Sequence, residues 1–275
     1  MKALILAGGF GTRLRPLTYR IPKCLLPINN KPIIMHQLEL LDSFDEIILA
    51  TNYLEEEIMA FLKERGIENV AINNEPEPLG TAGAVKNAER LLGKEFLVMN
   101  GDIITNCNID DLLEDGPNAI SVTHVEDISR YGNVISDERG MVSEFREKED
   151  NRIPGWINSG LYYLNEDIFD HIPKGRFSSL ERELFPFLAK ESKLRAIRND
   201  GYWHDVGTKD DFINTNISLA GTDSVIGDGC SIKGSEIERS VIMDNCVIEN
   251  SRIRNSIIGP NNRLMNISVE NDIVS

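Results

Sequence analysis

Residues 2–14 read KALILAGGFGTRL, an apolar run that leads directly into a loop with three glycines and an arginine. The run has the length and composition of a β-strand, and glycines without a Cβ let a ligand approach the backbone closely. Positive charge continues with Lys23, and Pro16 and Pro22 restrict the chain before it. The stretch therefore predicts a strand that ends in a phosphate-binding loop.

Two common phosphate-binding motifs do not match this loop. A dinucleotide-binding loop requires GxGxxG, but Leu14 stands where a third glycine would follow Gly9 and Gly11. A P-loop requires GxxxxGK followed by Ser or Thr, and the sequence contains no such string. A plain strand-to-helix turn would explain the glycines but not the flanking cations, so a different kind of phosphate loop is expected.

The residues from 2 to about 125 alternate between strand-like apolar runs and amphipathic helix-like segments. EIILAT (46–51) and FLVMN (96–100) are examples of the runs. This alternation predicts an α/β fold with a Rossmann-like, mostly parallel sheet flanked by helices. Further strands at AISVTHV, GNVIS, MVSEFRE and INSGLYYL are expected to extend the same sheet.

An internal repeat with a period of 16 residues begins after residue 221. The recurring apolar positions are Ile226, Ile242 and Ile258, then Ile232, Ile248 and Leu264, and then Ile237, Ile253 and Val269. Steps of five and six residues suit a three-sided coil, so the tail predicts a short left-handed β-helix of about three coils. We expect a larger domain over 1–220 and a β-helix domain over 221–275, with apolar Ile267 and Val269 at an open coil end that a homo-oligomer would cover.

The composition limits the classes of partner. The chain has 275 residues and a formal net charge of −15, which repels nucleic-acid phosphates, and no local basic patch compensates. No apolar stretch approaches the roughly 20 residues needed to span a bilayer. The four cysteines are far apart and form no CxxC pair. We therefore expect no nucleic-acid or membrane partner, free thiols, and a cytoplasmic location.

The stretch GGFGTRLRPLT, continued by PKCLLPI, resembles the signature of the sugar-phosphate nucleotidyltransferases, the NDP-sugar pyrophosphorylases. Further stretches keep the family's order along essentially the whole chain: EPEPLGTAGA, NGD, YGNV, FREK, INSGLYYL, SLERELFP and GYWHDVGT. Cys24 and Glu149 depart from the family, which more often has proline there, but neither change removes a charged group. The stretches SLERELFP and YWHDVGT look most like mannose-1-phosphate guanylyltransferases.

The resemblance implies that a sugar 1-phosphate oxygen attacks the α-phosphorus of a nucleoside triphosphate and releases pyrophosphate. The second pKa of a phosphate monoester is about 6, so the nucleophile is already ionised and positive charge is the main requirement. By resemblance, Arg13 contacts the leaving pyrophosphate and Lys23 contacts the phosphates near the attacked centre. The nucleotide-binding residues implied are Leu6, Ala7, Gly8, Gly9, Gly11, Thr12, Arg13, Glu75, Gly80 and Asp102.

The resemblance also implies a sugar-phosphate pocket and a metal. Lys148 would hold the sugar 1-phosphate, with Glu147, Gly132 and Asn158 lining the pocket. Asp102 and Asp205 would bind Mg²⁺, which prefers oxygen ligands and takes one or two carboxylates together with phosphates and water. The catalytic residues expected on this basis are Arg13, Lys23, Asp102 and Asp205.

Glu75 is the residue that bears on the choice of base. Family members that use thymine or uracil often have glutamine there, five residues before the glycine that corresponds to Gly80. A carboxylate accepts hydrogen bonds, and guanine offers two adjacent donors, whereas a solvated loop acid is the simpler interpretation. We expect guanine ahead of thymine and uracil, and mannose ahead of glucose or a heptose.

The sequence leaves other functional classes open. A glycosyltransferase of related architecture usually carries a DxD motif, but Gly101 and Ile103 flank Asp102. A hexapeptide acyltransferase commonly uses a histidine, and none follows His204. A non-catalytic sugar-nucleotide sensor would be expected to lack the charged residues, which are present here, and a glucose-1-phosphate thymidylyl- or uridylyltransferase is the alternative enzyme.

Overall fold

The computed structural model describes residues 1–146 and 152–275. The chain divides into two compact units that alternate along the sequence. The first unit comprises Met1–Gly9, Leu40–Asn52 and Leu62–Trp203, and the second comprises Phe10–Glu39, Tyr53–Phe61 and His204–Ser275. The domain boundary expected at residues 220 and 221 stays a prediction.

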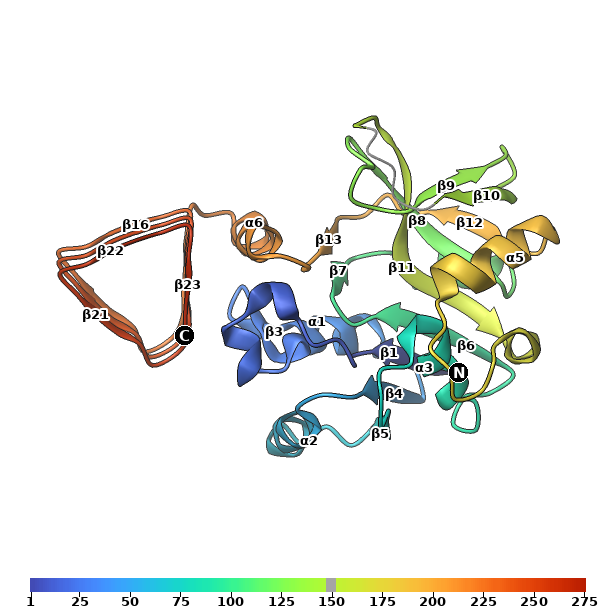
Figure 1. Cartoon of the computed structure of the whole chain (residues 1–275), viewed down its shortest axis with the longest axis horizontal. Coiled ribbons are helices and arrows are strands. Elements are labelled where there is room, and N and C mark those ends of the chain that lie inside the picture. The colour runs from blue at the N-terminus through green and yellow to red at the C-terminus, as the bar shows by residue number, and fades with distance from the viewer. Residues whose placement is uncertain (147–151) are drawn as a thin grey trace. The chain divides into compact units, whose positions relative to one another are not determined.

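The first unit is built on a mixed β-sheet whose parallel half follows the strand order β5-β4-β1-β6 (Figure 1). These strands are β1 (Lys2–Leu6), β4 (Glu46–Thr51), β5 (Val70–Asn74) and β6 (Glu95–Asn100). Leu4 of β1 is paired with Ile48 on one side and Val98 on the other. Apolar strands of this kind are buried on both faces, which is why the run KALIL does not alternate with polar residues. The expected α/β fold is confirmed.

The other half of the sheet contains antiparallel ladders around β11 (Gly155–Asn165), which pairs with β6, β8 (Ala119–Val125) and β9 (Asn133–Ser136). β10 (Val142–Arg146) pairs with β9, and β12 (Arg195–Arg198) runs parallel to β8. The register between β11 and β8 shifts between Asn158 and Tyr162. Gly160 lies within this shift at φ 82, a conformation that a β-branched residue would not adopt.

Helices of the first unit include α3 (Gly80–Asn87), α4 (Ile109–Glu114) and α5 (Phe185–Lys190), and a short strand β7 spans Ile103–Thr105. A 3-10 helix covers Glu166–His171, and a π-helix covers Leu180–Leu184 directly before α5. Val85 of α3 and Phe185 of α5 are fully buried in the same apolar core as Leu4 of the sheet. The core thus lies between the sheet and its helices.

The second unit begins with the segment after the glycines, which contains 3-10 turns at Thr12–Leu14, Leu17–Tyr19 and Lys23–Leu25. A short hairpin of β2 (Pro27–Ile28) and β3 (Lys31–Pro32) follows, and then α1 (Ile33–Leu40). α2 spans Glu55–Glu64, and β13 (Trp203–Asp205) precedes α6 (Lys209–Ala220). Among the described helices, none is long and apolar enough to cross a membrane.

α6 has strong start and stop signals. Thr208 and Asp211 form a capping box in which each side chain accepts the backbone N–H of the other, so the first turn of α6 is well fixed. The helix ends at Gly221, which is left-handed at φ 66. The chain then enters the repeat region.

The repeat region forms a β-helix whose sides are three parallel sheets, seen as a triangle in Figure 1. Val225 pairs with Val241, and Val241 pairs with Ile257, so each coil advances 16 residues, as the repeat predicts. The sheets contain β14 (Val225–Ile226), β17 (Val241–Ile242), β20 (Ile257–Ile258) and β23 (Ile273–Val274); β15 (Ser231–Lys233), β18 (Val247–Glu249) and β21 (Arg263–Met265); and β16 (Glu236–Glu238), β19 (Arg252–Arg254) and β22 (Ser268–Glu270).

The expected inward positions are confirmed in the second and third coils, whereas Ile226 of the first coil is 37% exposed and the expectation for the coil end is also corrected. The β-helix core contains Ile242, Ile248, Ile253, Ile258, Leu264 and Val269. Val269 is therefore buried at 8% exposure and is not open apolar surface as expected, because its side chain points into the coil. Ile267 is 40% and Met265 48% exposed, and these two side chains form the apolar surface instead.

Candidate active site

The end of β1 and the end of β6 meet at the carboxyl edge of the first unit's sheet. Ala7 N–H donates to Ala50 O at 2.9 Å, and Gly101 N–H donates to Leu6 O at 3.1 Å. A Cβ at Gly101 would lie 2.4 Å from Leu6 O, so this close approach requires glycine. Asp102 follows directly at the same edge, which is where open α/β sheets bind ligands.

Glu75 lies at the same edge and is held there by backbone contacts. Its N–H donates to Thr51 O at 2.7 Å, and its carbonyl accepts the side-chain amide of Asn52 at 2.7 Å. Its carboxylate accepts the Leu79 N–H through Oε2 at 3.2 Å. A Cβ built on Gly8 would lie 3.4 Å from Oε1, so the other carboxylate oxygen lies beside the glycine loop.

The environment of Glu75 is dry. The residue is 5% exposed, and burial raises the pKa of its carboxyl, although the Leu79 N–H partly offsets this by stabilising the charged form. A solvated loop acid would have neither property. The structure thus provides a buried acceptor at the place where a nucleotide-binding residue is predicted.

Gly80 is the first residue of α3, and its position also requires glycine. Its φ is 71, and a Cβ would lie 2.4 Å from Ser178 O, which accepts the N–H groups of Ala82 and Gly83. Ser178 N–H in turn donates to Leu79 O at 2.9 Å. The loop around Ser178 therefore fixes the start of α3 next to Glu75.

Two of the predicted sugar-phosphate residues are joined by the main chain, because Asn158 N–H donates to Gly132 O at 3.4 Å. The side chain of Asn158 is also fixed: its Nδ2 donates to Tyr162 Oη at 2.9 Å, and its Oδ1 accepts Gly160 N–H at 3.0 Å. Gly132 packs against Phe145, whose Cε1 would be 3.2 Å from a Cβ. Glu147 and Lys148, also predicted for this pocket, lie outside the described residues.

In the second unit, Gly11, Thr18 and Lys23 pack together. Gly11 is left-handed at φ 57, and its carbonyl accepts the Thr18 hydroxyl at 2.9 Å. A Cβ at Gly11 would lie 2.9 Å from Thr18 Cγ2 and 3.3 Å from Lys23 Cβ. Thr12 begins the 3-10 turn that follows. The Cβ of Lys23 therefore lies close to the backbone of Gly11.

Gly207 marks the place where Arg13 and Asp205 come together. A Cβ at Gly207 would lie 3.0 Å from Arg13 Nη2 and 3.3 Å from both carboxylate oxygens of Asp205. Asp205 ends β13, and Gly207 precedes the capping box of α6. The predicted catalytic arginine and one predicted metal ligand thus flank the same glycine.

The donor set suits a hard cation. Asp102 and Asp205 both offer carboxylate oxygens, which magnesium prefers, and magnesium completes its octahedron with phosphates and water. Within residues 1–146 and 152–275, no group of three or more His, Cys, Asp or Glu side chains could hold a metal ion. Each carboxylate alone is a suitable magnesium ligand, and the assignment of both to one metal ion stays a prediction.

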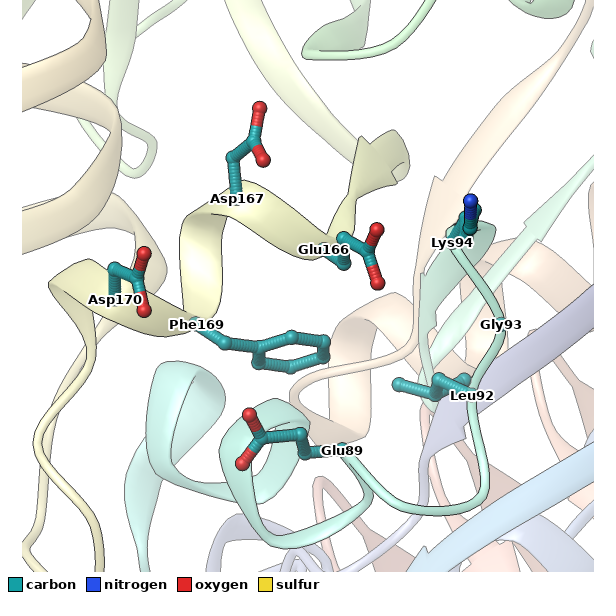
Figure 2. A pocket seen from close by; sticks show the side chains of 8 residues that line it. All are labelled: Glu89, Leu92, Gly93, Lys94, Glu166, Asp167, Phe169 and Asp170. Atoms are coloured by element: carbon teal, nitrogen blue, oxygen red, sulfur yellow. The ribbon is translucent and has the colours of Figure 1, made fainter.

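A hollow of about 590 Å³ opens at a different place in the first unit (Figure 2). Its wall includes Lys94 before the amino end of β6 and Glu166 after the carboxyl end of β11. It therefore lies at the edge of the sheet opposite to Gly8. Glu89, Asp167 and Asp170 add negative charge that would repel a triphosphate, so we do not assign the substrates to it.

Comparison with known families identifies the chain. A model of the nucleotidyl transferase family matches residues 2–221, and a model described as GlmU-like, C-terminal hexapeptide, matches residues 212–274. The chain belongs to the nucleotidyl transferase family. The first match covers the glycine segment, Glu75, Asp102 and Asp205, so all the predicted site residues lie within the family region.

Relatives of this nucleotidyl transferase include mannose-1-phosphate guanyltransferase of Gibberella zeae, 42% identical over 230 residues, and mannose-1-phosphate guanylyltransferase 1 of Arabidopsis thaliana, 42% identical over 228 residues. Each alignment covers 78% of the chain and 63% of the relative. The chain thus spans about 63% of the length of these relatives.

Solved structures agree with the family. HddC from Yersinia pseudotuberculosis, complexed with GMP-PN, has a TM-score of 0.68 and 31% identity, covering 79% of this chain and 99% of that one. A putative glucose-1-phosphate thymidylyltransferase from Bacillus anthracis, in complex with a sucrose, has a TM-score of 0.72 and 24% identity over 80% of this chain and 95% of that one. The second likeness concerns the fold alone.

Some residues that support the site in this nucleotidyl transferase carry no motif in the sequence. Asn52 and Thr18 hold the backbone of Glu75 and Gly11, respectively. Tyr162 is fully buried, and burial, followed by the charge of Glu181, raises the pKa of its hydroxyl well above the ordinary value. Asn52 follows directly after a strand, as ligand-edge residues do, and this position was the one available signal. Thr18 and Tyr162 gave none, because their contacts are tertiary.

Proposed function

We propose that the protein is a magnesium-dependent nucleotidyltransferase that joins mannose 1-phosphate to GTP, giving GDP-mannose and pyrophosphate. The observation that carries the proposal is the buried carboxylate of Glu75 beside Gly8 at the carboxyl edge of the sheet. The Leu79 N–H satisfies only part of the acceptor capacity of this buried carboxylate, so a ligand that supplies further donors would stabilise it.

Guanine supplies the donors that Glu75 requires. A carboxylate has about four acceptor positions, so Glu75 can keep the Leu79 N–H bond and still accept N1–H and the exocyclic amine. Thymine and uracil present one N–H between two carbonyls and would leave carboxylate and carbonyl facing each other. The GMP-PN named with the Yersinia protein supports a guanine nucleotide.

The remaining residues supply charge and position. Arg13 and Lys23 would stabilise negative charge that grows on the leaving pyrophosphate and on the attacked phosphate. The backbone N–H groups of Gly8, Gly9 and Gly11 would approach the triphosphate without a Cβ in the way. Magnesium, held by Asp102 and Asp205, would neutralise phosphate charge. The sugar 1-phosphate is already ionised at neutral pH, so no general base is needed.

The sugar end of the pocket is assigned to Gly132 and Asn158, with Glu147 and Lys148 following β10 along the chain. A homo-oligomer through the β-helix is also proposed, supported by the hexapeptide match and by exposed Met265 and Ile267. A monomer in analytical ultracentrifugation would contradict this second assignment.

The testing experiment is pyrophosphate release with magnesium across several nucleoside triphosphates and sugar 1-phosphates. GTP with mannose 1-phosphate is expected to give the highest kcat/KM. Preference for UTP or dTTP with glucose 1-phosphate would keep the reaction and discard the role of Glu75. No release with any pair, in folded protein, would favour the sensor alternative.

A further inference from the structure

Asn216 of α6 is a fully buried polar residue that contacts the hairpin after Lys23. Its Oδ1 accepts the Asn29 N–H at 2.8 Å, and its Nδ2 donates to Phe212 O at 2.9 Å and to Pro27 O at 3.4 Å. It is 0% exposed. Because a buried amide without partners is costly, this set of bonds fixes the position of the hairpin on α6.

The hairpin turn depends on this contact. Asn29 and Asn30 have φ values of 51 and 61, as a type I′ turn requires. Asn30 Nδ2 also donates to Ile226 O, in the first coil of the β-helix, at 3.0 Å. The turn is therefore held by α6 through one residue and by the β-helix through the next.

The β-helix also contacts the chain shortly after Arg13, at Leu17. Leu17 is 1% exposed, and a Cβ at Gly259 would lie 2.8 Å from Leu17 Cδ2. Thr18, the next residue, bonds the carbonyl of Gly11. Leu17 therefore occupies space that a side chain at Gly259 would fill. Leu17 is also next in sequence to Thr18, which bonds Gly11.

The segment has little regular structure of its own. Lys23 lies in a 3-10 turn of three residues that ends two residues before the hairpin, and Arg13 lies in another. Side-chain contacts to α6 and to the β-helix must therefore set where these two cations lie, because short 3-10 turns do not define a rigid element.

We propose that Asn216 of α6 and Gly259 of the β-helix are positioning residues for Lys23 and Arg13, so that both elements take part in catalysis by fixing the charged segment. The inference rests on the proposed function, in which these cations act on the transferred phosphate. Misplacement of a charged group by about 1 Å can cost about 100-fold in rate, so the effect is measurable.

The test compares N216L with wild-type protein in pyrophosphate release. N216L is expected to lower kcat about 10- to 100-fold while the KM for GTP changes less than about threefold, because Glu75 and Gly8 belong to the other unit and are untouched. G259A places a Cβ 2.8 Å from Leu17 Cδ2 and 3.1 Å from Val274 O and Ser275 Cα of the next coil, so it crowds Leu17 most, and it is expected to lower kcat in the same sense. G259A keeps the test decisive if N216L does not fold.

Two control variants separate positioning from general damage. N29G retains both the backbone N–H that Asn216 accepts and the freedom for positive φ, so its kcat is expected to be that of the wild type. N214A removes a side chain of the same helix that accepts a hydrogen bond from Arg239 of the β-helix at 2.5 Å; the bonds that join α6 to the hairpin are made by Asn216 instead. It is also expected to keep the wild-type kcat.

Hydrogen exchange provides a readout that does not depend on activity. The Asn29 amide and the turns at residues 12–25 are expected to exchange faster in N216L than in N29G. Equal exchange in both variants, or equal kcat in N216L, G259A and the controls, would overturn the inference. An inactive wild-type protein with the expected exchange difference would instead overturn the proposed function and leave the positioning contacts supported.

Discussion

The carboxyl edge of the first unit and the segment 10–32 of the second unit hold their predicted site residues by different means. At the edge, Gly8, Glu75 and Asp102 follow strands whose register is set by backbone pairing. In the segment, Arg13 and Lys23 lie in short turns that side-chain bonds and glycine contacts hold in place.

This difference indicates that the edge and the segment have different roles in the reaction. The edge offers a buried carboxylate and little positive charge, which suits recognition of a base. The segment offers cations and no buried acceptor for a base, which suits stabilisation of phosphate charge. Variants at the edge should therefore change which nucleotide is used, and variants in the segment should change the rate with every nucleotide.

The largest effect is expected for R13A. Removing one preorganised donor from a site where charge develops typically costs about 100- to 1000-fold in kcat, and R13A should lose this much with GTP and UTP alike. Steady-state pyrophosphate release measures it. R20A removes an exposed cation of the same segment and serves as the matched control. Equal losses in both variants would mean that net positive charge, and not the position of Arg13, is what matters.

E75Q should have the next largest effect, and it should fall on GTP. Hydrogen bonds to a charged group are worth about 1.5–3 kcal/mol, so kcat/KM for GTP should fall about 10- to 100-fold. Glutamine can pair with an imide edge, so the value for UTP should stay or rise. Competition between the two nucleotides measures this ratio directly. A parallel fall for GTP and UTP would break the comparison between edge and segment.

The raised pKa of Glu75 gives a pH dependence with a definite sign. Because the pKa is raised by burial, guanine binding should weaken as pH falls through a value above that of an ordinary glutamate. The same shift stabilises the fold below the unfolded pKa, and this contribution is lost as pH rises through the folded pKa. E75Q should therefore unfold at higher urea than wild type at neutral pH, with the difference vanishing in acid. Identical pH profiles in both proteins would contradict this.

The carboxyl edge can also be tested by a pair of glycines. G101A places a Cβ 2.4 Å from Leu6 O, so it should destabilise the fold by up to about 3 kcal/mol and displace Asp102. G9A has nothing within 4 Å of its Cβ and should leave the unfolding free energy unchanged while raising the KM for GTP. Thermal and urea unfolding separate the two. A stable G101A with full activity would mean that this edge is more adaptable than its contacts suggest.

The smallest effect is expected in the β-helix. Ser240 is 0% exposed, donates to Glu238 O at 2.8 Å and accepts the Ser256 N–H at 3.1 Å. S240A should cost about 1 kcal/mol of unfolding free energy through the orphaned N–H, with kcat unchanged. S231A, in the same coil, is the control. A large loss of kcat in S240A would show that the β-helix affects the segment through more than Gly259 and the contact of Ile226 with Asn30.

The two regions also differ in how far the sequence alone could predict them. The strands at 2–6, 46–51 and 119–125, and the 16-residue coil, follow from apolar periodicity, because backbone pairing makes that pattern necessary. The asparagines of the coils have a different cause: Asn245, Asn250 and Asn255 are left-handed at the corners of one turn, a conformation that asparagine adopts more readily than most residues. Asn216 and Thr18 contact residues that only folding brings near them, so no local sequence pattern predicts these contacts.

The site was predictable to the extent that it lies in contiguous motifs. Glu75 could be identified by its position, but its burial could not, since exposure depends on how Thr51 and Asn52 close over its backbone. The proximity of Arg13 and Asp205 to the same glycine, Gly207, was not predictable either, because nearly two hundred residues of chain separate them.

The most direct test of the division between edge and segment is the ratio of kcat/KM for GTP to that for UTP, measured with mannose 1-phosphate in wild type, E75Q and R13A. The division predicts that E75Q strongly lowers the GTP-to-UTP ratio. It predicts that R13A lowers both values and leaves the ratio unchanged. A ratio that collapses in R13A, or that survives in E75Q, would contradict it.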